Sequence, residues 1–586
     1  MRFFRDFAAL VLGLTLFGAA AARAEAPAEA LFRLLPPEAG LTLAVEDLRG
    51  HSRDFFASPL AGGLRQLPAV RAWFASDRFK RFDQARRQIE QVLGENIGTI
   101  RDELLGDAVV LSLNLAPDQR PDQASGLLLV RVRDRGLLDR LIQGFNAAQT
   151  KSGELARVAE HQHHAVSYTS REFRPGTKPT EYYTVLPDRT LVWSNSEALV
   201  QGVIDRTLGK VAGLSADPRF RKVRQRLPER VAVSLFADPR FLERIAAASA
   251  HGPRKPGEER TMAMLERYMK ALDYVGAGFQ WREGLLLHVE ETSDPERLDP
   301  WIRQMAAHPG KVDPRLRRVP PSALAVVTAD VDFAAILEGL RLLVPETDQV
   351  RFDNLMLAMS GVMLGQDVAS AILPQLGPGA TITLERPKEG SGSDRLGRVL
   401  AVTLDGEPNV AAAVDNGLKT LLAFSALNAK RGDGQTRVES RTVGGVKVTA
   451  LSEASPFAYA VAEGRLFVGS TPEAVARAAS AGADGAASAR VEEVRAECFP
   501  RAETFAWVDL RALHEFASSH RQQVARRLAA RQKRDEANSA RDLDQALALI
   551  KLFRVAFAAN EMTPDATSVH HTIGLIGRLP APEPKP

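Results

Sequence analysis

The stretch LGENIGTIRDELLGDAVVLSL, Leu93–Leu113, indicates how the fold is organised, because the chain contains a second version of it. The second version, LGQDVASAILPQLGPGATITL, Leu364–Leu384, comes roughly 270 residues later. Both versions end in an apolar run of the kind that forms a β-strand. One such match is weak by itself, but it predicts that other blocks recur at a similar separation.

Five further blocks recur in the same order along the chain. They are RLLPPEAGLTLAVED (33–47) with RRVPPSALAVVTADVD (317–332), GLLLVRVRD (126–134) with GRVLAVTLD (397–405), YYTVLPDRTLVWSNSEALV (182–200) with AYAVAEGRLFVGSTPEAVA (458–476), LPERVAVSLFAD (227–238) with FPRAETFAWVDL (499–510), and MKALDYVGAGFQW (269–281) with IKLFRVAFAANEM (550–562). The six blocks predict two tandem homologous repeats, residues 25–310 and 311–578, followed by a proline-rich tail, 579–586. HPGKVDPRLRRVPP, His308–Pro321, is the expected junction because proline and glycine interrupt helix and strand.

Each repeat is predicted to contain short strands that follow one another closely. LTLAVED, AVVLSLNL, YYTVLP and TLVWSN are apolar or alternating runs bounded by turn residues. Gly136–Gln149 and Ser196–Leu208 carry apolar residues at helical spacing. Strands a few residues apart suit hairpins better than parallel crossovers. The sequence therefore predicts an α+β fold in each repeat, with antiparallel β-sheet and helices packed on one face of it.

The N-terminal residues have the pattern of a signal peptide. Two arginines precede an apolar run, Phe7–Ala22, that is short for a membrane span. Ala22–Ala24 supplies the small residues that signal peptidase requires, so residues 1–24 are expected to be removed. An uncleaved N-terminal anchor is the alternative. No later segment has roughly 18 uncharged apolar residues, which predicts a soluble exported chain, periplasmic or extracellular, without a transmembrane helix.

Composition limits the partners of the exported chain. Removing three arginines and one aspartate with the signal peptide lowers the formal charge from +4 to +2. This balance predicts no nucleic-acid partner. Cys498 is the only cysteine, so no intrachain disulfide can form. Stability must therefore come from buried apolar area, for which the chain is long enough.

HQHHAVSYTS, His161–Ser170, puts three histidines in four positions and is the most chemically suggestive stretch. Zinc needs three or four ligands, and no other histidine or cysteine cluster lies nearby in the sequence. His163 and His164 align with Gly444–Gly445, a strong signal for a two-residue hairpin turn. We therefore expect a solvated hairpin tip and no metal or other cofactor. If a metal is bound, His161, His163 and His164 are its candidate ligands.

Asp134 and Asp405 end equivalent predicted strands in the two repeats. Carboxylates at strand ends can act as acid and base. The helical pattern that follows Asp134 instead favours a role as helix cap. Two aspartates in separate repeats also argue against one paired-carboxylate centre, so no catalytic residue is assigned.

A basic helix is predicted at His520–Gln545, with six cations between Arg521 and Arg534. A helix of this kind can rest on anionic lipid or on a wall polymer. Its apolar face holds little beyond Val524 and Leu528. This thin face favours a solvated helix over membrane insertion.

Local catalytic signatures are missing from the sequence. It contains no nucleophile elbow, no zinc-protease motif, no Walker A loop and no dinucleotide-binding fingerprint. Their absence leaves an enzyme possible, because triads assembled from distant residues leave no local trace.

Several stretches together resemble exported bacterial envelope proteins of a domain-of-unknown-function family. They are LLPPEAGLTLAVEDL, LLGDAVVLSL, and YTVLPDRTLVWSNSEALVQGVID followed by LSADPRFRKVRQRLP. The resemblance covers most of the first repeat and, more loosely, the second. It implies an envelope location and an α+β fold, and it carries no catalytic residues. The second repeat has Pro378 where the first has Asp107, which suggests that the Gly–Asp pair of the family serves a turn.

Two classes of function remain open. The first is a non-enzymatic binding or structural protein that presents a surface to an envelope protein, a polymer or a lipid. The alternative is a hydrolase or another enzyme with an unrecognised site between the two repeats. The duplication favours the first, because a doubled surface needs no single constellation of residues.

Overall fold

The computed structural model describes residues 27–115, 123–176, 178–249, 258–281, 284–307, 312–387, 396–404, 408–429, 436–452, 455–482 and 486–577. The predicted signal peptide (1–24), the predicted tail (579–586), the predicted repeat boundary at residues 310 and 311, and Asp405 lie outside these residues. Contacts divide the chain into two compact units. Of the described residues, 27–249 and 272–293 form unit 1, and 258–271 and 294–577 form unit 2.

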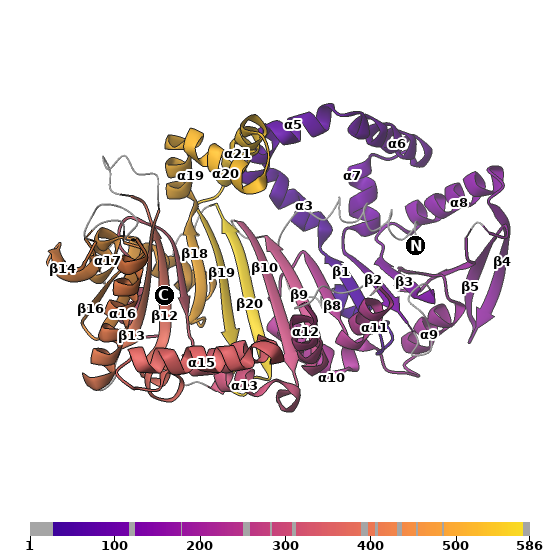
Figure 1. Cartoon of the computed structure of the whole chain (residues 1–586). Helices are drawn as coiled ribbons and strands as arrows, with labels where there is room; N and C mark the ends of the chain where they lie inside the picture. Colours follow the sequence, from indigo (N-terminus) through magenta and orange to yellow (C-terminus); the bar gives the residue numbers. More distant parts are fainter. Residues whose placement is uncertain are drawn as a thin grey trace, which may run out of the picture. The chain divides into compact units, whose positions relative to one another are not determined.

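Unit 1 is built on an antiparallel sheet (Figure 1). Its strands are β1 (Leu41–Glu46), β2 (Ala108–Asn114), β3 (Ser125–Arg131), β4 (Leu155–His163), β5 (Val166–Phe173), β6 (Glu181–Val185), β7 (Thr190–Ser194), β8 (Val233–Ala237), β9 (Leu272–Trp281) and β10 (Gly284–Ser293). Their order across the sheet is β4-β5-β6-β7-β3-β2-β1-β8-β9-β10. The order puts the N-terminal strand β1 in the middle, between β2 and β8.

The strands of unit 2 are also antiparallel. Its strands are β11 (Ala323–Ala329), β12 (Leu376–Glu385), β13 (Gly397–Leu404), β14 (Val438–Val443), β15 (Val446–Leu451), β16 (Ala458–Ala462), β17 (Arg465–Gly469), β18 (Thr504–Asp509), β19 (Val555–Met562) and β20 (Ser568–Ile576). Their order is β14-β15-β16-β17-β13-β12-β11-β18-β19-β20. Taken in chain order, the strands of the two units therefore occupy the same places in their sheets. The predicted α+β class with antiparallel sheet is confirmed.

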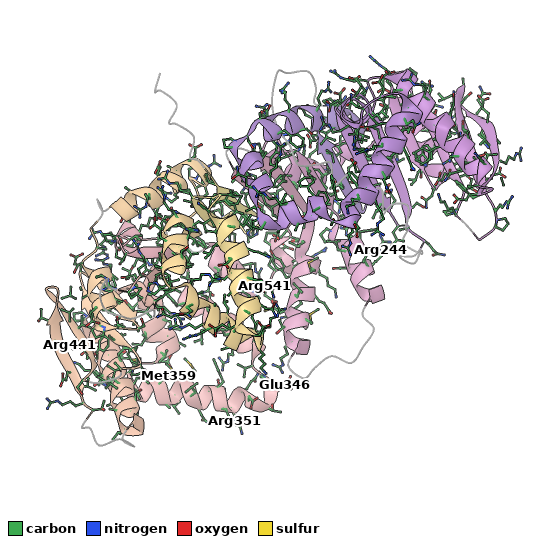
Figure 2. The ribbon with its side chains drawn as sticks, turned by 90° about the horizontal axis from the view of Figure 1, so that it is seen from above. Arg244, Glu346, Arg351, Met359, Arg441 and Arg541 are labelled. Carbon is green, nitrogen blue, oxygen red and sulfur yellow. The ribbon has the colours of Figure 1, made fainter. Side chains whose placement is uncertain are left out.

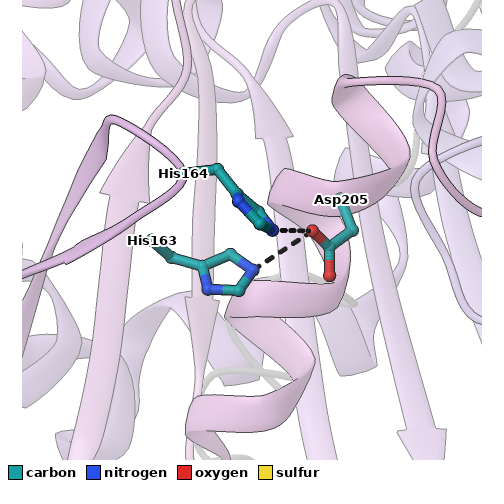
Figure 3. Close-up of side chains that lie close together, drawn as sticks. All are labelled: His163, His164 and Asp205. Atoms are coloured by element: carbon teal, nitrogen blue, oxygen red, sulfur yellow. Dashed lines mark hydrogen bonds and ion pairs between the residues drawn. The ribbon is translucent and has the colours of Figure 1, made fainter.

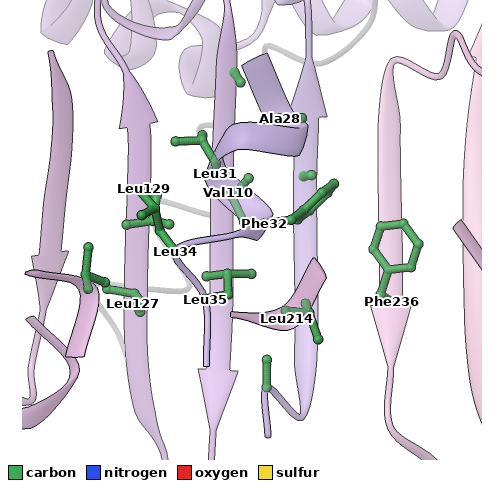
Figure 4. Packing of buried hydrophobic residues seen from close by; sticks show 14 of the residues in the cluster. Ala28, Leu31, Phe32, Leu34, Leu35, Val110, Leu127, Leu129, Leu214 and Phe236 are labelled. Carbon is green, nitrogen blue, oxygen red and sulfur yellow. The ribbon is translucent and has the colours of Figure 1, made fainter. Parts of the chain in front are cut away.

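The helices of unit 1 enclose its sheet and supply much of its core. They are α2 (Pro27–Phe32), α3 (Leu48–Ala57), α4 (Pro59–Gln66), α5 (Pro68–Ala75), α6 (Asp77–Leu93), α7 (Ile97–Ile100), the π-helix η1 (Arg101–Leu105), α8 (Arg135–Lys151), α9 (Glu197–Thr207), η3 (Leu214–Ala216), α10 (Pro218–Arg226) and α11 (Pro239–Ser249). Phe32 of α2 packs edge-on against Phe220 and Phe236, with ring centroids 5.2 and 5.6 Å apart. Figure 4 shows Phe32 and Phe236 in this cluster. Buried aromatic contacts of this kind fix the orientation of α2 on the sheet.

Buried apolar clusters occupy both faces of each sheet, which corrects the prediction that helices pack on one face only. On β1 the neighbours Ala44 and Val45 belong to two different buried clusters, and each cluster contains helical residues. Successive strand residues point to opposite faces of a sheet. On β13, Ala401 and Val402 are divided between clusters in the same way. The continuous apolar run of β3, with five successive buried residues, indicates the same two-sided burial.

Unit 2 has its own set of helices. They are α12 (Glu258–Ala271), η4 (Pro295–Arg297), α13 (Pro300–Ala307), η5 (Pro314–Arg317), α14 (Phe333–Leu343), α15 (Glu346–Val362), the π-helix η6 (Val368–Ile372), η7 (Leu373–Gln375), α16 (Pro408–Ala429), α17 (Pro472–Ala479), α18 (Ala486–Cys498), α19 (Leu510–Ser519), α20 (Arg521–Gln532) and α21 (Glu536–Ile550). Ala474, Val475 and Ala478 of α17 are buried among residues of β13, β15, β16 and β17. This small-residue face lets α17 approach the sheet closely.

One helix among the described residues, α16, is long and apolar enough to cross a membrane by length and composition. The segment is Pro408–Leu427, with a mean hydropathy of 1.3. Val414 and Leu422 are buried in a cluster with strand residues of unit 2. The helix also carries an ion pair between Lys419 and Asp415, with 2.5 Å between Nζ and Oδ2. A helix with one buried apolar side and a charged pair has the pattern of an amphipathic helix packed against a protein core, and its residues Leu421, Phe424 and Leu427 are exposed.

Candidate metal centre on the hairpin of β4 and β5

β4 and β5 form a tight hairpin. The last paired residues are His163 and Val166. His164 and Ala165 form the turn, with φ angles of 46° and 62°. Two successive positive φ angles are typical of the type I′ turn, whose twist matches that of a hairpin. The prediction that His163 and His164 lie at or beside a hairpin tip is therefore confirmed.

The corresponding hairpin of unit 2, β14–β15, closes with Gly444 and Gly445, whose φ angles are 56° and 85°. The sequence match aligns Gly444 with His163, which is wrong by one residue. In the structure Gly444 takes the place of His164, and Gly445 that of Ala165. The position of the turn follows from the last pair of residues bonded across the hairpin. The sequence does not show where strand pairing ends.

Asp205 on α9 brings a carboxylate to the two histidines (Figure 3). Its Oδ1 lies 3.1 Å from Nε2 of His163 and 3.2 Å from Nε2 of His164. The two imidazole centroids are 4.2 Å apart. One ligand atom from each residue lies within 4.8 Å of the other two, and within the described part of the chain no other such group of histidine, cysteine or acidic residues converges. Sequence reasoning missed Asp205 because no motif or spacing links α9 to the hairpin.

Contacts on both sides hold α9 against the hairpin. Three apolar residues of α9 are buried in the largest core cluster of unit 1. Tyr168 on β5 donates a hydrogen bond to the Glu197 carboxylate at the start of α9. Gln201 Nε2 donates to the Tyr168 hydroxyl at 3.1 Å. Burial, aided by Glu197, raises the pKa of Tyr168 and keeps it a donor, so the helix that carries Asp205 is tied to the strand beside the histidines.

His161, the third candidate ligand, lies apart from this group. Its Nε2 is 2.8 Å from the Ser170 hydroxyl across the hairpin. Its ring stacks on Tyr168, with 5.3 Å between centroids and 21° between planes. The structure therefore brings together two of the three predicted candidates and adds Asp205.

The group offers two imidazole nitrogens and one carboxylate oxygen. Zinc and related divalent transition metals take this donor set in proteins. The side chains of His163, His164 and Asp205 are 24%, 45% and 26% exposed, so water reaches them. Without a cation, Nε2 of His163 must carry a proton to donate its hydrogen bond to Oδ1 of Asp205, because an ionised carboxylate only accepts.

Asp134 is a helix cap, as the sequence predicts. Its Oδ1 accepts a hydrogen bond of 2.9 Å from the backbone N–H of Leu137 in the first turn of α8. Such a bond satisfies one of the free N–H groups at a helix start. Asp405, its predicted counterpart, lies outside the described residues.

The predicted basic helix forms two helices, α20 and α21, because Lys533 adopts a left-handed conformation with a φ of 53° and ends α20. Three of its cations form ion pairs with acidic residues of α21: Arg521 with Asp544, Arg526 with Glu536, and Arg534 with Asp542. Val524 and Leu528 pack against a cluster formed with α19 and α21. The thin apolar face is therefore directed toward the protein.

Comparison of the chain with models of protein families, with curated proteins and with solved structures finds no match.

Proposed function

We propose that this chain is an exported bacterial envelope protein, built from two copies of one unit, that works by binding to a lipid surface and not by catalysis. The observation that carries the proposal is an exposed aromatic patch, defined as Trp73, Phe74, Phe79 and Phe82 on α5 and α6.

Two tandem homologous repeats are supported by the sheets as well as by the six sequence blocks. Strands from matching blocks take the same positions in both sheets. A π-helix precedes the second strand of each unit, η1 before β2 and η6 before β12. π-Helices are rare, so their shared position supports a common origin.

Export is supported by the signal-peptide pattern of residues 1–24. The protein recovered from the periplasm or medium of producing cells should begin at Glu25 when its N-terminus is sequenced. An intact Met1 on membrane-bound protein would instead identify an uncleaved anchor.

The aromatic patch is a cluster and not a set of scattered residues. The Phe79 ring centroid lies 4.9 Å from those of Trp73 and Phe74, and 6.2 Å from that of Phe82. Trp73, Phe74 and Phe82 are 51%, 47% and 48% exposed. Single exposed apolar residues are ordinary, but contiguous apolar patches mark interaction sites. The aromatic patch is therefore expected to bind a partner that covers these side chains and removes them from water.

Positive charge surrounds the aromatic patch. Residues 71–87 contain six basic and two acidic residues. Arg71, Arg78 and Arg81 make no ion pair among the residues that the structure describes. Exposed aromatics beside free cations are the pattern of a helix that lies in the interface of an anionic membrane. The cations of α20 differ, because Arg521 and Arg526 form ion pairs with carboxylates of α21.

The corresponding helix of unit 2 is also unusually exposed. α15 precedes η6 as α6 precedes η1 along the chain, and Ser360 is its only buried residue. Val350, Leu355 and Leu357 are 69%, 56% and 73% exposed. Figure 2 shows the helix with Glu346, Arg351 and Met359 along it. Exposed apolar residues therefore recur in unit 2, but α15 carries three acidic residues and one basic residue, so it lacks the cations that support lipid binding at the aromatic patch.

Vesicle co-sedimentation of the processed, exported protein tests the proposal. We expect binding to phosphatidylcholine vesicles that contain phosphatidylglycerol, weaker binding to phosphatidylcholine alone, and release by high salt. Trp73→Ser with Phe82→Ser should weaken binding at least about tenfold, since each buried aromatic contributes about 1.5–3 kcal/mol.

Phe145→Ser is the matched control, because Phe145 is 50% exposed on α8, outside the patch. It should bind vesicles like the wild type. Wild-type protein that fails to bind anionic vesicles, or a Trp73→Ser and Phe82→Ser variant that binds normally, would overturn the proposal.

A further inference from the structure

We infer that His163, His164 and Asp205 form a binding site for one divalent transition metal ion, and we propose that this ion is zinc. The inference is independent of the proposed membrane binding, because it rests on different residues and on a different kind of ligand.

The two distances from Asp205 to the histidine nitrogens are close to those between ligand atoms of a tetrahedral zinc site. Zinc binds histidine nitrogen and carboxylate oxygen at about 2.0–2.2 Å, and two ligand atoms at a tetrahedral angle are then about 3.4 Å apart. Oδ1 of Asp205 lies 3.1 and 3.2 Å from the two Nε2 atoms. Small movements of these side chains would therefore replace the contacts to Asp205 with bonds to a metal ion. The exposed side of the site leaves the fourth position to water.

The donor set also restricts which cation fits. Two imidazoles and one carboxylate favour zinc, nickel, cobalt or copper(II) over magnesium and calcium, which prefer oxygen ligands. No cysteine belongs to the group. The donor set therefore favours transition metal ions of intermediate softness over hard cations such as magnesium and calcium.

The backbone supplies an independent reason to assign a role to His164. Its φ of 46°, like the 62° of Ala165, lies in the left-handed region that favours glycine. The corresponding turn of unit 2 uses Gly444 and Gly445 for the same geometry. The turn itself therefore does not require histidine at position 164, and glycine would suit it better. Keeping histidine here places its imidazole beside that of His163.

The ligands sit on supported elements, as a metal site requires. His163 ends a paired strand, and Asp205 lies on a helix whose buried face belongs to the core. The bonds from Tyr168 and Gln201 link the two elements next to the site. Metal binding therefore needs little reorganisation of the chain.

Isothermal titration with zinc alone tests the inference. Untagged, processed protein is stripped with EDTA and dialysed before the titration. We expect one zinc ion per chain in the wild type. His164→Gly removes a ligand but installs the residue that the turn of unit 2 uses, so the variant should fold, as circular dichroism can verify, and should bind zinc at least about 10–100-fold more weakly.

Ala165→Gly is the matched control, since it changes the same turn and keeps all three ligands; it should bind zinc like the wild type. Asp205→Asn removes the carboxylate charge from the opposite side and should weaken binding to a similar extent as His164→Gly. A wild-type chain that binds no zinc, or unchanged binding in both His164→Gly and Asp205→Asn, would overturn the site.

Discussion

The two hairpin turns allow a reciprocal exchange of residues. Ala165 and Gly445 occupy the second turn position of β4–β5 and β14–β15, with φ angles of 62° and 85°. We predict that Ala165→Gly stabilises the first hairpin and that Gly445→Ala destabilises the second.

The magnitude follows from the backbone alone. No heavy atom lies within 4 Å of a Cβ added at Gly445, so alanine there meets no steric clash with other residues. A left-handed conformation costs an L-residue about 1–2 kcal/mol. Alanine recovers about 0.4–1 kcal/mol by restricting the unfolded chain. The net destabilisation by Gly445→Ala is therefore about 1 kcal/mol, and Ala165→Gly should stabilise by about the same amount, which is about fivefold in an opening equilibrium.

Amide hydrogen exchange of the two hairpins measures this effect locally, which matters because a chain of two units need not unfold in one step. Exchange within 155–173 should slow about fivefold in Ala165→Gly, and exchange within 438–451 should accelerate about fivefold in Gly445→Ala. Each hairpin serves as the control for the other. Unchanged or slower exchange in Gly445→Ala would refute the left-handed assignment of the turn.

Two further predictions concern buried charges. Arg171 and Glu181 form an ion pair whose side chains are only 3% and 8% exposed, and burial raises the pKa of Glu181 although Arg171 opposes it. Arg171→Met should cost about 3–5 kcal/mol, seen as a lower urea midpoint, and adding Glu181→Leu should recover most of the loss; a double variant as unstable as the single one would contradict this reading. Burial also raises the pKa of Glu385, against the effect of Arg477. The stability contributed by Glu385 is therefore complete below its unfolded-state pKa of about 4.5 and declines as pH rises through the folded-state pKa. Glu385→Gln removes that decline. The urea midpoint of the variant minus that of the wild type should therefore increase between about pH 4.5 and 7.5. A difference in midpoint that does not change with pH would count against the raised pKa of Glu385.

Local features were predictable wherever neighbouring residues determine them. The cap at Asp134 depends on a helix that starts directly after it, and the turn at His164 depends on a two-residue connection between strands. The antiparallel class follows from short strands with short connections. Prediction was wrong where local pattern leaves a choice: the basic segment breaks at Lys533 into two helices, and helices cover both faces of the sheets.

The α+β class, the recurring blocks, the hairpin that carries His163 and His164, and the absence of an intrachain disulfide could all be predicted from residue order. These features depend on residue type, periodicity and short separations along the chain. Three contacts became visible only in the folded chain: Asp205 lies beside the two histidines, cations of α20 pair with carboxylates of α21, and Trp73 and Phe82 stay exposed in one aromatic patch. Those contacts depend on how elements distant in the sequence pack together, and burial of a side chain is a property of that packing and not of the residue.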